Sequence, residues 1–178
     1  MTSIAYTLIA GTAPLLRNLS GLLDKAEAHA RAKGQSPDDY VGARLAPDMF
    51  DLARQVQFAC FGPVTGAQRV LGRAASPPGD PDAAFAALKA RIAETVAALE
   101  ALDPADFDGA DDREVVQPMQ GTRILELKGS VYVRDWLIPN FYFHLVTAYD
   151  ILRNQGVELS KRDYLAHNAG AIRDTAAA

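Results

Sequence analysis

Hydrophobic side chains return every three or four residues in four separate segments of the chain, a spacing typical of helices that bury one face. Glycine favours helix ends, so Gly34 is predicted to end the first helix and Gly156 to follow the last. The other boundaries predict a second helix from Pro47 to Gly72, a third from Asp80 to about Leu102, and a fourth from about Ser130 to Gln155.

Prolines inside these segments predict local distortion, since proline cannot donate a backbone hydrogen bond. We expect a bend at Pro14 in the first helix, a kink or break at Gly62–Pro63 in the second, and a bend at Pro139 in the fourth. Pro47 and Pro81 instead suit the first turn of a helix and mark predicted starts.

The chain between the third and fourth predicted helices contains two short β-prone stretches. One surrounds Val115 and Val116, and the other runs from Thr122 to Lys128. They predict a β-hairpin that packs on the helices, because a lone hairpin is only marginally stable in water. The expected fold is mainly α, an up-and-down four-helix bundle with a short β-hairpin between the third and fourth helices.

A length of 178 residues suits one domain, which we expect to cover residues 1–167. After the last helix, Tyr164 and Leu165 are expected to anchor an ordered tail. Residues 168–178 have little to bury and are expected to be flexible.

The composition narrows the class of protein. Hydrophobic residues make up 49% and charged residues 22%, with a net charge of −4 and scattered basic residues, which argues against a nucleic-acid partner. There is no apolar run near the roughly 18 residues that span a bilayer, and no Lys or Arg precedes Arg17 as in a signal peptide. With Cys60 as the lone cysteine, a cytoplasmic location fits best.

The fourth predicted helix is apolar almost all round except for one polar line. Asn140, His144 and Thr147 lie at i, i+4 and i+7, so they share one narrow sector of the helix. A buried polar line is either satisfied by neighbouring groups and water, or borders a pocket that holds a metal or a small ligand.

Metal binding is the first alternative for this line. Asn140 and His144 stand one turn apart, a spacing that lets two side chains share a divalent cation such as zinc or nickel. Amide oxygens are poor ligands for these metals, and the chain has only three histidines. Asp48, Asp51 and Gln55 share one edge of the second predicted helix, and the two acids can supply carboxylates, although acids in a first turn also stabilise the helix dipole.

Other catalytic patterns are weak or absent. Nothing adjacent in sequence to Cys60 lowers its pKa. No serine lies in a Gly-x-Ser-x-Gly setting, and no glycine-rich phosphate loop is present.

Aromatic residues crowd the fourth predicted helix. Trp136 and its neighbours can line an apolar pocket, or they can fill a core or an interface. Phe143 points away from the side that carries Phe141, so the hairpin, the tail or a second subunit must cover it. The last option makes a homodimer the expected assembly.

Two long stretches of sequence resemble an uncharacterised bacterial family in the DinB/YfiT-like four-helix-bundle superfamily. They are Pro139–Gly156 with the tail Lys161–Leu165, and Leu45–Phe50 with Ala53–Val56 and Gly62–Pro63. The resemblance implies the bundle fold.

The resemblance also implies what a metal site would contain. Many superfamily members hold a divalent metal with one histidine from the second helix and a His-x-x-x-His pair from the last, and include hydrolases and thiol transferases. Here Asn140 and His144 stand at the pair, and the second helix has no histidine. Only His144 matches a ligand position, so the metal site looks degenerate.

Three hypotheses follow. In the first, a pocket binds a small molecule without a metal. The residues that border this pocket are Asp48, Asp51, Gln55, Trp136, Asn140 and His144. In the second, His144 and carboxylates of the second helix hold a metal that activates water or a thiol. In the third, the polar line is a satisfied core network in a structural or interaction protein. The sequence does not decide whether the protein is an enzyme.

Overall fold

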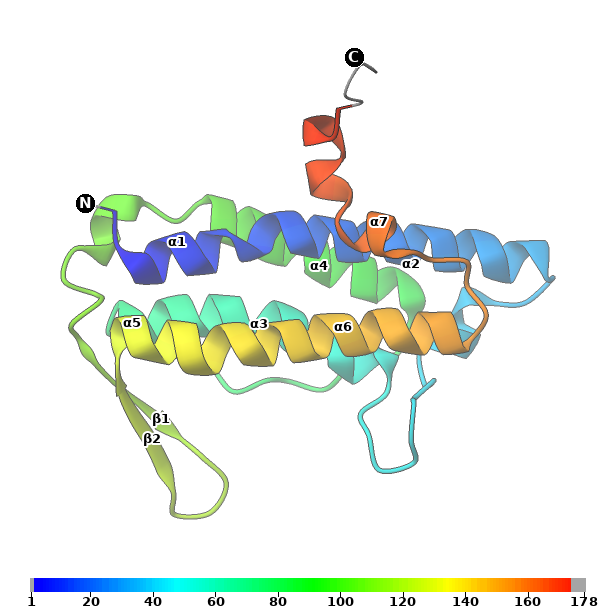
Figure 1. The fold of residues 1–178 in the computed structure, drawn as a ribbon. Coiled ribbons are helices and arrows are strands. Elements are labelled where there is room, and N and C mark those ends of the chain that lie inside the picture. The colour runs from blue at the N-terminus through cyan, green and yellow to red at the C-terminus, as the bar shows by residue number, and fades with distance from the viewer. Residues whose placement is uncertain (1, 174–178) are drawn as a thin grey trace.

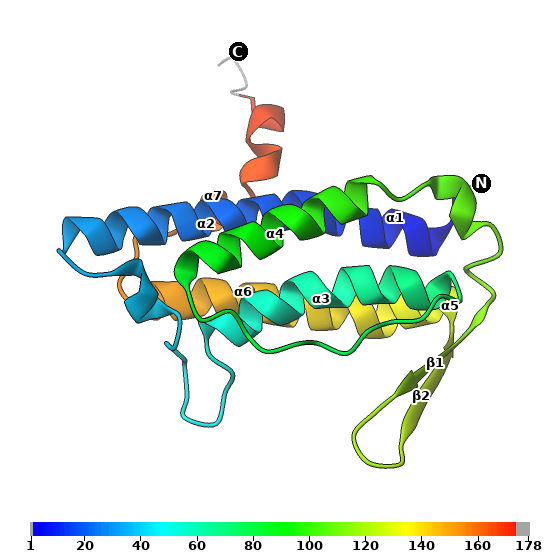
Figure 2. The ribbon, with the colours of Figure 1, turned by 180° about the vertical axis from the view of Figure 1, so that it is seen from behind.

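The structure is a computed structural model, which describes residues 2–173. Its long helices lie in two layers (Figures 1 and 2). One layer contains α1 (Ile4–Ala10), α2 (Thr12–Ala32) and α4 (Phe85–Glu100), and the other contains α3 (Leu52–Val70) and α6 (Ile138–Asn154). Helix α3 packs on both α4 and α6, which agrees with the predicted helical bundle.

Shorter elements connect these helices. They are the 3₁₀ helices η1 (Pro37–Tyr40), η2 (Pro104–Phe107) and η4 (Ala166–Ala171), the short helices α5 (Gly129–Val131) and α7 (Lys161–Tyr164), the π-helical segment η3 (Tyr132–Leu137), and the strands β1 (Glu114–Pro118) and β2 (Ile124–Lys128).

The first predicted helix is interrupted at Gly11, between α1 and α2. The ring of Pro14 would clash with the carbonyl of Ala10, four residues earlier, so the distortion appears one turn before the proline. Asp111 holds the start of α1, because its carboxylate accepts hydrogen bonds of 2.8 Å from the Ser3 hydroxyl and from the backbone N–H groups of Ile4 and Ala5.

The predicted start of the second helix at Pro47 is wrong, since α3 begins at Leu52. The Asp51 carboxylate accepts a hydrogen bond from the backbone N–H of Arg54 at 3.0 Å and acts as the N-cap. The predicted break at Gly62–Pro63 is also wrong, because α3 continues to Val70. Gly62 has no Cβ to clash with the ring of Pro63, and packing on α4 and α6 holds the helix together.

The third predicted helix begins at Phe85, five positions after the expected cap at Asp80. The Gln57 amide nitrogen donates to the carbonyl oxygens of Gly79 and Asp80, at 2.8 and 3.1 Å, and so holds this connector against α3. The Asp38 carboxylate accepts from the Phe85 backbone N–H at 2.7 Å. A distant acid therefore takes the capping role expected of Asp80.

The predicted hairpin is present as the antiparallel pair β1–β2, with Val116 opposite Glu126. Val115 is buried, and β1 contacts α3 while β2 contacts η3. The rest of the hairpin projects away from the helices (Figure 1).

The last predicted helix is one helical rod formed by α5, η3 and α6. Its π-helical turns end just before Pro139, where they accommodate a residue without a backbone N–H. Gly156 follows the helix with φ +86°, as predicted.

The tail folds back on the bundle through Val157 and Leu159, both buried, and through Tyr164. Leu165 is exposed, so its predicted role as an anchor is wrong. The segment η4 extends away from the bundle (Figure 2), although His167 contacts Asn18 on α2 through a hydrogen bond of 2.5 Å. The tail predicted to be flexible, residues 168–178, includes residues 174–178, which lie outside the described part of the chain.

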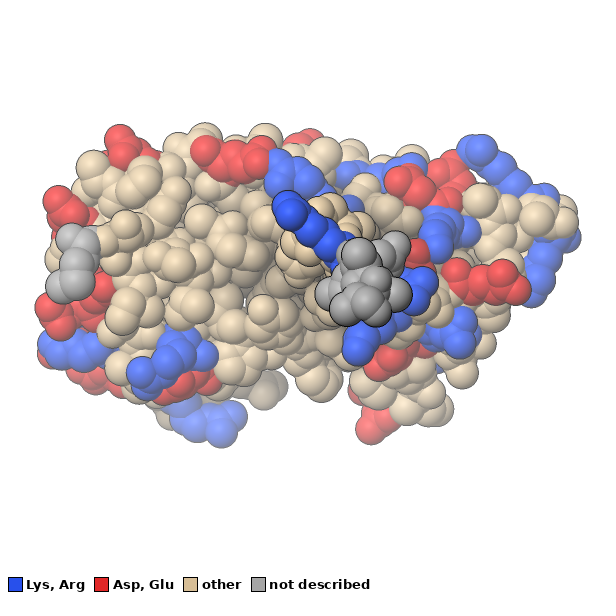
Figure 3. All heavy atoms as spheres, turned by 45° about the horizontal axis from the view of Figure 1, so that its top comes forward, with Lys and Arg blue, Asp and Glu red and all other residues tan. Residues whose placement is uncertain are grey.

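Positive and negative side chains intermingle on the face shown in Figure 3, beside a broad area with few charges. Within residues 2–173, no helix has the length and apolar character needed to cross a membrane.

Candidate functional site

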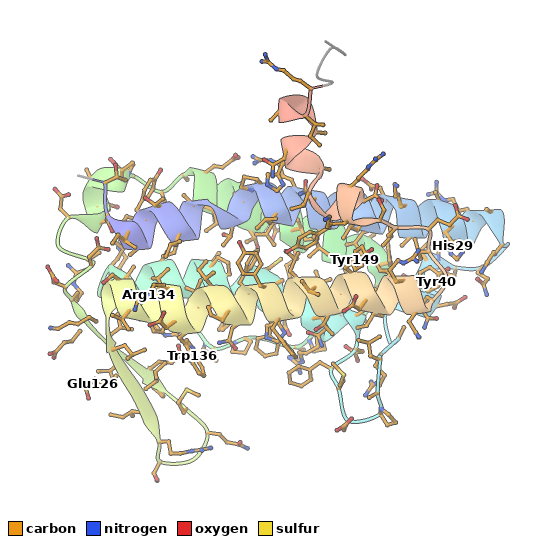
Figure 4. The ribbon with its side chains drawn as sticks, in the orientation of Figure 1. His29, Tyr40, Glu126, Arg134, Trp136 and Tyr149 are labelled. Carbon is orange, nitrogen blue, oxygen red and sulfur yellow. The ribbon has the colours of Figure 1, made fainter. Side chains whose placement is uncertain are left out.

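A cavity of about 240 Å³ lies between α3, the η3–α6 rod and the hairpin. Trp136 lies on the side of the rod from which the hairpin projects (Figure 4). Aromatic rings form much of the wall, from Phe50, Phe58, Phe61, Tyr132, Trp136 and Phe141. Polar side chains enter at separate points, from Thr65, Arg69, Gln117, Asn140 and His144.

His144 reaches from α6 to α3, where its Nδ1 lies 2.8 Å from Oε1 of Gln55. The Gln55 amide nitrogen donates to the Phe50 carbonyl at 3.3 Å, which orients its oxygen towards the imidazole. An amide oxygen can only accept, so Nδ1 of His144 carries the proton. Nε2 is then an acceptor, for which no hydrogen bond is found within residues 2–173.

The imidazole of His144 belongs to an aromatic stack. The Phe58 ring stacks on it with centroids 5.1 Å apart, and Phe50 in turn stacks on Phe58 with centroids 5.5 Å apart. Burial lowers the pKa of His144 to about 4. The ring is therefore neutral at pH 7, and Nε2 presents a lone pair instead of a proton.

The other members of the polar line are bonded within their own helix. The Asn140 amide nitrogen donates to the Trp136 carbonyl at 2.7 Å, and the Thr147 hydroxyl donates to the Phe143 carbonyl at 2.7 Å. Asn140 still lines the cavity. Of the three, His144 is the one whose side chain bonds to another helix.

The structure brings Gln55, Asn140, His144 and Trp136 together but places Asp48 and Asp51 elsewhere. Neither acid lines the cavity. Asp51 caps α3 and pairs with Arg44 at 3.2 Å, while Asp48 lies in the turn before that cap. Because α3 begins after these residues, they do not share its inward face.

The side chains around His144 do not fit a zinc or nickel site. Within residues 2–173, no three His, Cys, Asp or Glu side chains come close enough together to hold a metal ion. Nδ1 of His144 is engaged by a neutral amide. His29 bonds to Tyr40 at 2.8 Å, far from Trp136 at the other end of the bundle (Figure 4), and His167 bonds to Asn18.

Cys60 is buried, and burial raises the pKa of its thiol to about 12. The thiolate needed for nucleophilic catalysis is therefore absent at neutral pH.

A second polar group in the cavity was missed by the sequence patterns. Tyr132 donates its hydroxyl proton to Oε1 of Gln117 at 2.7 Å, and Nη1 of Arg69 lies 3.4 Å from the same hydroxyl. Gly62, Thr65 and Arg69 have helical spacing along α3, a weak signal for one shared face. Nothing in the local sequence signals that Gln117 of the hairpin joins them.

Comparison with known proteins gives a family but no activity. The family described as "Domain of unknown function (DUF1993)" matches residues 6–165. The crystal structure of a DinB family member protein from Shewanella denitrificans is similar, with 40% sequence identity, a TM-score of 0.81, and coverage of 90% of each chain. No curated protein matches.

Proposed function

This chain belongs to the DUF1993 family, and we propose that it binds a small, largely apolar molecule in the cavity beside His144, without a metal centre. The observation that carries the proposal is the neutral His144, with Nδ1 held by Gln55 and Nε2 available to a ligand. The ligand would donate a hydrogen bond to Nε2 from a hydroxyl or amide group, while the aromatic walls would contact its apolar body.

The character of His144 favours binding over proton transfer. A general base works best when its pKa lies near the working pH. The pKa of about 4 makes this imidazole a weak base, although a sound hydrogen-bond acceptor.

The alternative of a metal-dependent hydrolase or thiol transferase has less support. It needs several anionic or imidazole ligands, whereas His144 is accompanied by the amides of Gln55 and Asn140. The alternative of a purely structural protein leaves the cavity and the free Nε2 without a role.

Trp136 provides the test, because it is the chain's single tryptophan and it lines the cavity. We expect decan-1-ol to change its fluorescence saturably, and to bind about 3- to 10-fold more tightly than the methyl ether of decan-1-ol, which lacks the donor. His144→Phe should remove this preference, whereas His167→Gln on the tail should keep it.

Circular dichroism of each variant checks that it is folded. If wild-type protein shows no saturable response to either compound, or if His144→Phe retains the preference for the alcohol, the proposed function is wrong.

A further inference from the structure

The cavity contains an unbalanced positive charge at Arg69. Among the described residues that line the cavity, Arg69 alone carries a full charge at neutral pH, because none of them is an acid and His144 is neutral. Within residues 2–173, Arg69 takes part in no ion pair. Arg69 is half-buried, and burying an arginine charge is costly unless an anion accompanies it.

The neighbours of Arg69 leave most of its hydrogen-bonding capacity unused. Within the described part of the chain, its one side-chain bond is the 3.4 Å contact from Nη1 to the Tyr132 hydroxyl. Tyr132 in turn donates to Gln117 Oε1, so the hydroxyl oxygen can accept from Arg69. Among residues 2–173, the Gln117 amide nitrogen finds one partner, the Met119 sulfur at 3.7 Å. This end of the cavity therefore offers hydrogen-bond donors to a ligand.

We propose that Arg69 binds the carboxylate of the ligand, so that the cavity selects carboxylic acids with an apolar body. This inference rests on the proposed function, since it concerns the same cavity. A guanidinium presents parallel N–H groups that match the two oxygens of a carboxylate. The opposite partner, Nε2 of the neutral His144, accepts a hydrogen bond and has none to donate, so it cannot stabilise an anion.

The positions of the two polar groups indicate an elongated ligand. Phe58, which stacks on His144, and Arg69 are 11 residues apart on α3, which corresponds to about 16 Å along the helix axis. Long side chains on a helix generally lean back towards its start, which for Arg69 is the direction of Phe58 and His144. A carboxylic acid with an extended chain and a hydroxyl at its far end can bind Arg69 through its carboxylate and donate a hydrogen bond to Nε2 of His144.

The experiment compares decanoate with decan-1-ol by Trp136 fluorescence, at low ionic strength and pH 7. We expect wild-type protein to bind decanoate at least 10-fold more tightly than Arg69→Gln does, while the affinity for decan-1-ol changes less than twofold. Arg69→Lys, which keeps the charge, should recover part of the loss. We also expect 10-hydroxydecanoate to bind more tightly than decanoate.

Arg73→Gln is the matched control, because it removes the same charge from an exposed ion pair with Asp106 outside the cavity. It should leave both affinities unchanged. If Arg69→Gln binds decanoate as tightly as wild-type protein, the carboxylate site is wrong. If decan-1-ol binds and decanoate does not, only this inference fails. If neither binds to wild-type protein, the proposed function fails as well.

Discussion

His144 shows how a single side chain acquires its chemistry from its neighbours. Gln55 fixes the proton on Nδ1, Phe58 covers one face of the ring, and burial lowers the pKa to about 4. The same imidazole in water would be half protonated near pH 6.5. Its environment turns a titrating group into a neutral acceptor at physiological pH.

The lowered pKa of His144 predicts a loss of stability in acid. The unfolded chain binds this proton near pH 6.5 and the folded chain only near pH 4, so protonation favours unfolding. Between pH 7 and pH 4, wild-type protein should lose about 2 kcal/mol more unfolding free energy than His144→Phe, after allowance for partial solvent exposure.

Urea denaturation at a series of pH values measures this difference. Asp111 and Asp163 also have lowered pKa values, Asp111 through its backbone and Ser3 hydrogen bonds and Asp163 chiefly through Lys25. They titrate in both proteins and cancel in the comparison. Parallel pH profiles for the two proteins would contradict the prediction.

Helix α3 and the η3–α6 rod approach closely at Gly66. A Cβ at this position would lie 1.7 Å from the Cδ1 atom of Leu137. Leu137 and Tyr132 of the π-helical segment also line the cavity. The glycine therefore permits the contact that shapes one end of the candidate site.

Gly66→Ala should destabilise the protein by about 1–3 kcal/mol, because overpacking outweighs the gain in helix propensity. Gly21→Ala in α2 is the control, since a Cβ there meets nothing within 4 Å. It should stabilise the protein by about 0.5–1 kcal/mol. Unfolding free energies from chemical denaturation give both values, and a stabilised Gly66→Ala protein would refute the close contact.

An exposed apolar face on α6 bears on whether the protein forms a homodimer. Tyr142, Phe143 and Val146 on α6 are all exposed, at 42%, 57% and 40%. Within residues 2–173, neither the hairpin nor the tail buries them, although Tyr164 of the tail lines a hollow beside Val146. The homodimer expected from the sequence therefore stays a prediction in which a second copy buries this face.

Sedimentation velocity over a range of protein concentrations tests the dimer. We expect a dimer for wild-type protein and a monomer for Phe143→Glu, because burying an unpaired carboxylate is costly. Ile124→Glu on the hairpin, also at an exposed apolar position, should remain dimeric. A wild-type monomer at every concentration would exclude this assembly.

Local sequence was enough to predict the helices, the hairpin and the inward position of His144. Helical spacing, glycine stops and β-branched stretches act within a few residues, so they can be interpreted without distant contacts. Helix starts were less predictable where more than one residue could act as the N-cap. Asp51 and the distant Asp38, rather than Pro47 and Asp80, define the starts of α3 and α4.

Long-range packing assembles the candidate site itself. Gln55 meets His144 across 89 positions of sequence, and Arg69 meets Tyr132 across 63. Gln117 joins them from a hairpin whose docking on α3 no local pattern encodes. The periodicity of a helix says which of its faces is buried, but the partner of that face depends on how distant segments pack. Here that packing brings the charged group, Arg69, and the hydrogen-bond acceptor, His144, into one cavity.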